Sequence, residues 1–209
     1  MSFDHTFFFL IYRIFSHDGM LFAASILGVL NHKILLAILT VVLLTTGVNL
    51  GSIPISAPQN NRLKMSLAMI FFIIVSALGT YGINQTIIKP LVERPRPCHT
   101  YPDTVAKQDQ SNTPMTSKSS YLCSPHSSMP SNHAVFFATI TGSLLVLGHS
   151  LLSWCFILLT FMVSLSRITV GAHYPSDILV GWLFGGGVGW LIGQLILSCF
   201  YQNGETTSK

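Results

Sequence analysis

The sequence predicts an all-α protein: a polytopic bundle of five to six transmembrane helices, preceded by an N-terminal interfacial helix. Half of the 209 residues are hydrophobic, only 9% are charged and the mean hydropathy is +0.57, which is too apolar for an ordinary soluble domain. The apolar residues also gather in segments close to the roughly 20 residues that a helix needs to cross a bilayer. These segments are residues 34–50, 65–88, 134–148, 151–165 and 178–201.

The N-terminal segment, residues 1–31, precedes the first of these spans. It is apolar enough for a sixth span, but Arg13 and Asp18 interrupt it, and a charge near the bilayer centre costs about 2.5–3.5 kcal/mol on insertion scales. We therefore expect interfacial helices here rather than a crossing. From the apolar composition and the series of spans, residues 1–209 are predicted to form a single membrane-embedded domain.

A long connection, residues 89–129, separates the second span from the third. It is polar and rich in Ser, Thr and Pro, and a loop of this length in a compact protein is usually functional or disordered. Cys98 and Cys123 bracket it. If the loop faces an oxidising compartment, a disulfide between them would stabilise the protein by roughly 3–4 kcal/mol. Cys155 and Cys199 fall inside spans, where we expect them to pack as small hydrophobes.

The first polar motif begins where the second span ends. Lys89 closes that span, and Pro90 disfavours continuing the helix beyond it. Arg94 and Arg96 follow, and the proline after each arginine forces an extended backbone. Because residues two apart in an extended chain point to roughly the same side, both guanidinium groups are predicted to face one anion beside the ammonium of Lys89. The alternative is a set of snorkelling cations bound to lipid headgroups.

The second motif, Pro130-Ser131-Asn132-His133, opens the next span. Ser131 is a good N-cap residue, and the start of a helix offers an anion free backbone N–H groups and the positive end of the helix dipole. His133 then lies where it could pass a proton to a departing oxygen. An ordinary capped helix with an interfacial histidine is the alternative.

The third motif, Ser166-Arg167-x5-His173-x3-Asp177, links the last two spans. Arg167 ends one span and adds a cation. Pro175 suits the first turn of the next helix, so Asp177 falls about one turn beyond His173. A carboxylate there can accept a hydrogen bond from one ring nitrogen and leave the other free to act as a nucleophile, which is the arrangement used in covalent catalysis.

In this order the three segments resemble the motifs of the type-2 phosphatidic acid phosphatase family, within the acid phosphatase and vanadium haloperoxidase superfamily. The family pattern is Lys-x6-Arg-Pro, Pro-Ser-Gly-His and Ser-Arg-x5-His-x3-Asp. This chain matches the first and third motifs and has Asn132 in place of the glycine. The resemblance covers residues 65–201 and implies a membrane lipid phosphatase without a metal or other cofactor. A zinc site made by His99, Cys123 and His126 is the weaker alternative.

The roles that the resemblance implies centre on three reacting residues. His173 would attack phosphorus to form a phosphohistidine, Asp177 would orient its imidazole, and His133 would protonate the leaving oxygen. The residues expected to bind the phosphoryl oxygens are Lys89, Arg96, Ser131, Asn132 (through its backbone amide) and Arg167. Arg94 is added by the alternation argument alone.

The substrate class expected from this resemblance is a lipid phosphate. We expect undecaprenyl diphosphate, with phosphatidylglycerophosphate, phosphatidate and lipid A phosphate as alternatives. A lipid phosphotransferase that uses the same histidine and a non-catalytic anion or lipid carrier also stay open. Expected partners are this substrate and membrane lipids, but not nucleic acid, because the net charge of +4 forms no basic stripe.

The order of the spans places all three motifs on one face of the membrane. Once the site residues are excluded, the Lys and Arg counts of the two faces are nearly equal, so the cysteine pair decides the orientation. We expect a multi-pass protein of the bacterial inner membrane whose site faces the periplasm. A stripe of glycines on the last span allows a second helix to approach closely, either within the bundle or in a homodimer, and leaves the oligomeric state open. The stripe is Gly181, Gly185, Gly189 and Gly193.

Overall fold

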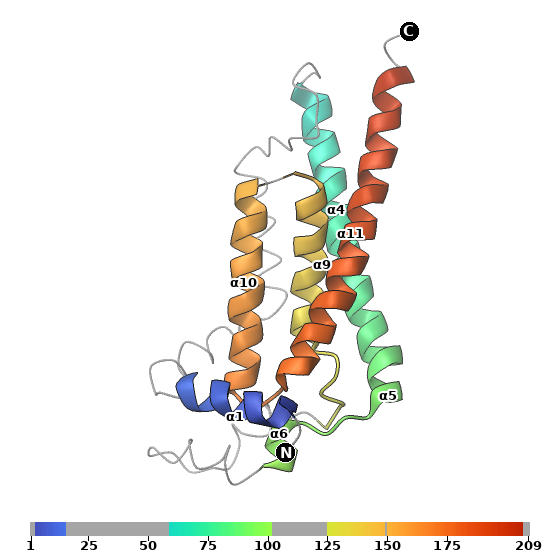
Figure 1. The fold of residues 1–209 in the computed structure, drawn as a ribbon. Coiled ribbons are helices and arrows are strands. Elements are labelled where there is room, and N and C mark those ends of the chain that lie inside the picture. Colours follow the sequence, from blue (N-terminus) through green and yellow to red (C-terminus); the bar gives the residue numbers. More distant parts are fainter. Residues whose placement is uncertain (1–2, 16–58, 102–124, 149, 207–209) are drawn as a thin grey trace.

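The computed structural model describes residues 3–15, 59–101, 125–148 and 150–206, and the regular structure in these ranges is entirely helical. The elements are α1 (Phe3–Phe15), α4 (Gln59–Ile83), the π-helix η1 (Asn84–Ile88), α5 (Lys89–Val92), α6 (Pro97–Thr100), α9 (Asn132–Val146), α10 (Ser150–Thr169) and α11 (Pro175–Thr206). Figure 1 shows α4, α9, α10 and α11 running side by side, which confirms the predicted all-α bundle.

Three stretches of the described residues are long and apolar enough to cross a membrane, and α9 is a shorter apolar helix. The stretches are Leu67–Thr100, Leu151–Thr169 and Pro175–Cys199. Together with α9 they account for four of the five expected spans, and they make the chain a membrane protein. The expected span over residues 34–50 and the N-terminal residues 16–31 lie outside the described residues.

Helix α9 forms the centre of the bundle. Every residue from Ala134 to Leu144 is buried, as expected for a helix that other helices surround. Helices α11, α10 and α4 all pack against it, α11 most extensively. Phe136 and Ile140 lie in its core cluster with Met69 of α4 and Val163 of α10. The start of α9, which carries the second motif, is therefore held between neighbouring helices.

The glycine stripe of α11 packs directly against the backbone of α9. A Cβ atom at Gly185 would lie 2.2 Å from the Val135 carbonyl oxygen, and one at Gly189 would lie 2.1 Å from the Thr139 oxygen. Ser143 donates a hydrogen bond across the same contact to the Gly189 oxygen at 3.0 Å. The stripe therefore serves packing within the bundle, as the first of the two interpretations predicted.

All three polar motifs lie at one end of the bundle. Figure 1 shows α5, α6, the starts of α9 and α11 and the end of α10 at this end, while the C-terminus lies at the other. This arrangement confirms the shared face predicted from the order of the spans. Helix α1 lies across the same end, and its buried Phe8 and Tyr12 pack with Ile168, Tyr174 and Ile178.

The second span was expected to end at Lys89 because Pro90 follows it, but the helix continues beyond that point. The helix passes through the π-turn of η1 into α5 and stops at Glu93, whose φ of 46° is left-handed. The Lys89 N–H donates to the oxygen of Asn84, five residues earlier. A proline clashes with the carbonyl four residues before it in a regular helix, and the wider turn just before Pro90 allows the helix to continue.

Candidate active site

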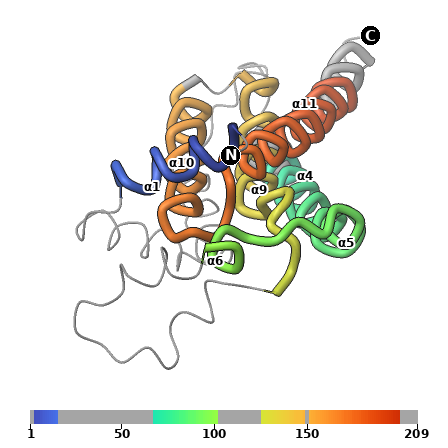
Figure 2. The backbone as a smooth tube through the Cα atoms, turned by 60° about the horizontal axis from the view of Figure 1, so that its bottom comes forward, coloured from blue at the N-terminus to red at the C-terminus, as the bar shows by residue number. Residues whose placement is uncertain are grey.

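The first and third motifs bring five buried titratable side chains to this end of the bundle. Lys89, Arg96, Arg167, His173 and Asp177 are each at most 7% exposed. Figure 2 turns this end toward the viewer and shows the α5–α6 segment passing beside the starts of α9 and α11. Charged side chains are seldom buried unless they are paired or functional, so the cluster is the candidate site.

Two of the cations reach across to the segment that leads into α9. The Lys89 Nζ donates to the carbonyl oxygen of Ser127 at 3.0 Å, and the Arg96 Nε donates to that of His126 at 3.1 Å. The Arg96 Nη1 also donates to the Ala172 oxygen at 3.2 Å, in the link between α10 and α11. One arginine thus holds the first and third motifs together.

The third motif forms the one-turn arrangement that its spacing predicted. The His173 Nδ1 lies 3.6 Å from Asp177 Oδ2, slightly longer than a hydrogen bond, and catalytic pairs often tighten only when substrate binds. Asp177 Oδ2 also accepts the backbone N–H of Tyr174 at 2.8 Å, and its Oδ1 accepts Arg94 Nη1 at 2.7 Å. Both carboxylate oxygens are therefore fixed in place.

The environment of His173 keeps its imidazole neutral. Burial lowers the pKa of His173 from the usual 6.5 to about 4; the charges of Arg96 and Lys89 act in the same direction, and Asp177 opposes them. A neutral ring near pH 7 has a lone pair available on one nitrogen, which an attacking nucleophile requires.

Three buried polar atoms of the motifs have no hydrogen-bond partner among the described residues. They are Ser131 Oγ, Arg167 Nη2 and His173 Nδ1. Ser131 occupies the predicted N-cap position of α9, but its side chain makes no capping hydrogen bond. Leaving a buried polar group unpaired costs about 1–3 kcal/mol, so each such atom needs an explanation. His173 Nδ1 faces Asp177, whereas Ser131 Oγ and Arg167 Nη2 are donors that an anionic ligand could pair with. His133, on the first turn of α9, is half-buried.

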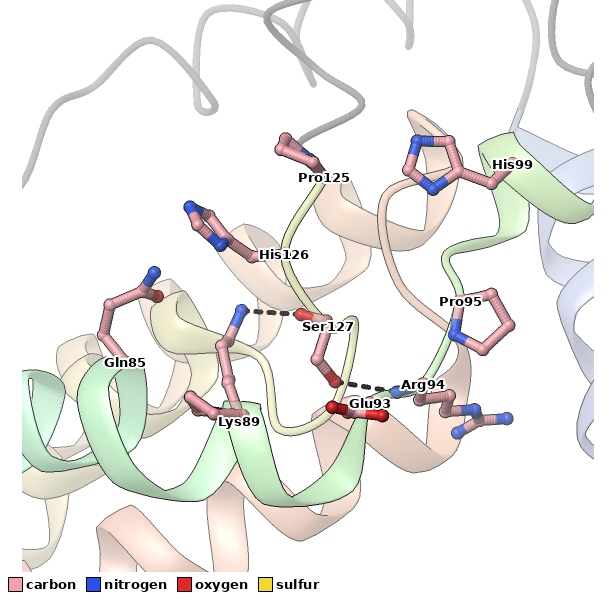
Figure 3. Close-up of a pocket in the computed structure, with 10 residues that line it drawn as sticks. Gln85, Lys89, Glu93, Arg94, Pro95, His99, Pro125, His126 and Ser127 are labelled. Atoms are coloured by element: carbon pink, nitrogen blue, oxygen red, sulfur yellow. Dashed lines mark hydrogen bonds between the residues drawn. The ribbon is translucent and has the colours of Figure 1, made fainter.

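Arg94 does not join Arg96 in facing an anion, contrary to the alternation argument. Its guanidinium donates to Asp177 and Asp4 and lies 4.3 Å above the ring of Tyr174. Figure 3 shows it pointing away from Lys89. Arg96 has a polyproline-like backbone, with φ −80° and ψ 155°. A polyproline helix has three residues per turn, so residues two apart in it point in different directions.

The side chain of Asn132 is turned toward η1. Its Oδ1 accepts Asn84 Nδ2 at 2.5 Å, and its Nδ2 donates to Gln85 Oε1 at 2.6 Å. Asn84 also donates to the Pro130 oxygen at 3.3 Å. Sequence reasoning missed Asn84 and Gln85, although a fully buried amide inside an apolar span is itself a signal. Residue 132 can therefore offer a ligand its backbone amide, as a glycine would.

A cavity of about 470 Å³ adjoins the cluster. It is lined by Gln85, Lys89, Pro90, Glu93, Arg94, Pro95, His99, Pro125, His126 and Ser127. Figure 3 shows Lys89 reaching across it to Ser127. His99 and His126 both line it, but the described residues contain no cluster of three or more His, Cys, Asp or Glu side chains that could hold a metal ion, and Cys123 lies outside them.

The cysteines differ in their surroundings. Cys98, on α6, is disulfide-bonded, and its backbone N–H donates to the Gly171 oxygen at 3.0 Å. The partner expected from the sequence, Cys123, is not among the described residues, so the pairing stays a prediction. Cys155 and Cys199 are exposed on their helices. Both lie on membrane-length helices, as expected, but on faces that are not covered by other helices of the bundle.

Residues 66–201 match the sequence profile of the PAP2 superfamily. The chain belongs to the PAP2 superfamily. It is 43% identical over 58 residues to a bacitracin transport permease protein, BcrC, of Bacillus licheniformis, covering 28% of each chain. It is 35% identical over 68 residues to an undecaprenyl-diphosphatase of Sulfolobus acidocaldarius, covering 32% of this chain and 33% of that protein.

A solved structure of the same superfamily also matches the chain. It is the crystal structure of a transmembrane PAP2-type phosphatidylglycerolphosphate phosphatase from Bacillus subtilis, at 16% identity and a TM-score of 0.40, covering 95% of this chain and 94% of that one. The alignments with the two curated relatives span about a third of their length or less. Membership of the PAP2 superfamily confirms the resemblance read from the three motifs.

Proposed function

We propose that this PAP2 protein is a metal-independent membrane lipid phosphatase that works through a phosphohistidine on His173. The observation that carries the proposal is the buried His173–Asp177 pair, together with two buried donor atoms that have no partner among the described residues, Ser131 Oγ and Arg167 Nη2, at the same end as Lys89 and Arg96. A nucleophile, hydrogen-bond donors and cations are what phosphoryl transfer requires of a protein.

The reaction proceeds in two steps. The free ring nitrogen of His173 attacks phosphorus while the bond between phosphorus and the leaving oxygen breaks, and His133 supplies the proton that this oxygen takes up. Asp177 stabilises the positive charge that develops on the imidazole of His173. In the second step water attacks phosphorus, His133 accepts its proton, and the phosphorus–nitrogen bond breaks to release inorganic phosphate.

The proposed substrate is undecaprenyl diphosphate, which would yield the lipid monophosphate and inorganic phosphate. Its support is the partial similarity to an undecaprenyl-diphosphatase and the location of the site at the ends of membrane helices, where a lipid chain can stay in the bilayer while its phosphates reach water. Phosphatidylglycerophosphate, phosphatidate and lipid A phosphate belong to the same class. We place the site on the periplasmic face of a bacterial inner membrane, because the predicted disulfide requires an oxidising compartment.

The test is phosphate release from these four lipids by the purified protein in detergent with EDTA, comparing wild type with His173→Ala. We expect release by the wild type, loss of at least about 10³-fold in the variant, and an acid-labile phosphoryl label on the wild type alone. Transfer of the label to a second lipid instead of water would favour a phosphotransferase.

The relative named as a transport permease keeps a carrier as the second candidate. A carrier would bind lipid phosphate without releasing phosphate, and His173→Ala would leave that binding intact. Release that survives both EDTA and His173→Ala would refute the proposed nucleophile.

A further inference from the structure

The N-terminal helix α1 reaches the candidate site through a single carboxylate. Asp4, in the first turn of α1, pairs with the Nη2 of Arg94. Its Oδ1 also accepts the backbone N–H of Ser176 at 3.0 Å, and its Oδ2 accepts the Ser176 hydroxyl at 2.7 Å. The backbone N–H groups in the first turn of a helix have no acceptor within the helix. Asp4 supplies one for α11, as an N-cap side chain would, although 172 residues separate it from Ser176.

Arg94 connects this carboxylate to the one beside the nucleophile. Its Nη1 donates to Asp177 Oδ1 at 2.7 Å and to Ser176 Oγ at 2.6 Å. The guanidinium therefore lies between two carboxylates, one from α1 and one from α11. A planar fork held at both ends has little freedom to rotate, which favours the contact between Nη1 and Asp177.

Helix α1 also supports the ring on which Arg94 rests. The guanidinium carbon lies 4.3 Å from the centroid of the Tyr174 ring. The His5 ring lies 5.1 Å from that ring and the Phe8 ring 5.7 Å from it. Phe8 is fully buried. The contacts of Asp4 and of Tyr174 thus hold the guanidinium from its edge and from its face, and both depend on α1.

Asp4 carries the negative charge that pairing with Arg94 requires. Burial alone would raise the pKa of Asp4, but hydrogen bonds from Ser176 and Arg94 outweigh it and lower the pKa below its usual value. Asp4 is therefore ionised near neutral pH, as is the guanidinium that it pairs with. The pair is about one-fifth exposed, so its contribution lies in orientation more than in Coulomb energy.

We propose that Asp4 is a positioning residue: it holds Arg94 against Asp177, the carboxylate that orients the nucleophile. The inference rests on the proposed function and adds to it an N-terminal helix that completes the site. Outer partners that orient the ligands of a metal commonly change activity by about 10–100-fold when they are removed, and we expect an effect of that order for a residue that orients Asp177. The simpler alternative is an ion pair that only helps α1 to dock.

The test compares Asp4→Asn, which keeps an acceptor for Ser176 but loses the charge, with Thr6→Ala, an exposed position on the same helix. Both variants are assayed for phosphate release per folded protein in detergent. We expect Asp4→Asn to lower kcat about ten-fold with KM nearly unchanged, Asp4→Glu to recover part of the loss, and Thr6→Ala to match wild type. In an Arg94→Ala background, Asp4→Asn should have no further effect on kcat, because the connection is already broken.

Two results would overturn the inference while leaving the phosphatase intact. One is an Asp4→Asn enzyme with wild-type kcat. The other is an additive loss in the double variant. A lowered thermal stability with unchanged kcat would assign Asp4 to docking alone. If the wild type released phosphate from no lipid, the proposed function itself would fail, and the inference with it.

Discussion

Replacing Gly185 with alanine tests whether the close contact between α9 and α11 sets the geometry of the site. The added Cβ would lie 2.2 Å from the Val135 carbonyl oxygen, 1.2 Å closer than the 3.4 Å at which ordinary contact begins. The Val135 carbonyl carbon and Cα would both lie at 2.9 Å. Because all three atoms belong to the backbone, no change of rotamer can relieve the clash. The two helices must move apart by about 1 Å.

The expected magnitude follows from that displacement. Overpacking costs about 1–3 kcal/mol, and a backbone clash belongs at the upper end of this range. The same movement would reach the site, because the Ser131 N–H on α9 donates to the Asp177 carbonyl oxygen on α11 at 3.1 Å. A misplacement of about 1 Å can cost 10²-fold in rate. We therefore expect Gly185→Ala to lose about 2–3 kcal/mol of stability and 10- to 100-fold in kcat.

Gly186→Ala and Gly187→Ala are matched controls on the same helix. A Cβ at either position would meet nothing within 4 Å, and alanine is favoured over glycine in a helix by up to about 1 kcal/mol. The controls should therefore be as stable as wild type or slightly more so. Thermal unfolding in detergent and phosphate release per folded protein measure both effects. A Gly185→Ala protein as stable and active as Gly186→Ala, or changed only in oligomer size, would refute the packing argument.

Two further predictions concern the site. Burial lowers the pKa of His173 to about 4, so protonation should block its attack on phosphorus only below that pH. The acid limb of the pH profile of kcat/KM should therefore lie near pH 4. An acid limb near pH 6.5 that titration of the lipid phosphate does not explain would contradict a neutral, buried His173. Asn132→Gly removes the hydrogen bonds to Asn84 and Gln85 and should lower stability by about 1–2 kcal/mol, measured by thermal unfolding. Its kcat for phosphate release should stay within about ten-fold of the wild-type value. A variant as inactive as His173→Ala would mean that the Asn132 side chain contacts substrate.

The predictable parts of this protein depend on regular geometry. Apolar segments of membrane length give helices, and alternate helix ends share a face, so three motifs distant in sequence could be placed together. His173 lies two residues before α11, and the first turn of that helix, begun by Pro175, brings Asp177 beside it. Cysteine pairing, by contrast, depends on a loop whose path no periodicity describes, and the Cys98–Cys123 bridge stays a prediction.

The failures arise where the backbone departs from a regular form. The helix continued past Lys89 because a π-turn accommodated Pro90, and sequence periodicity does not reveal such a turn. The direction of the Arg94 side chain was predicted wrongly because the alternation of a pleated strand was applied to a proline-rich segment. Asp4 was missed because its partners, Arg94 and Ser176, lie far away along the chain, and an acidic residue in a first helical turn is common in helices of every kind.

The pairing of Arg94 with Asp177 also determines the charge of the candidate site. Lys89 and Arg96 donate to backbone carbonyls, which satisfy their hydrogen bonds but do not neutralise their charge. Arg167 adds a third buried cation. If Asp177 were not already paired with Arg94, it would cancel part of this positive charge and repel a phosphate. Arg94 pairs with both Asp177 and Asp4, so it offsets only part of the Asp177 charge. The four cations Lys89, Arg94, Arg96 and Arg167 still outnumber these two carboxylates. Asp177 can therefore support the imidazole of His173 while the site keeps a net attraction for an anion, which in a buried site is much stronger than in water.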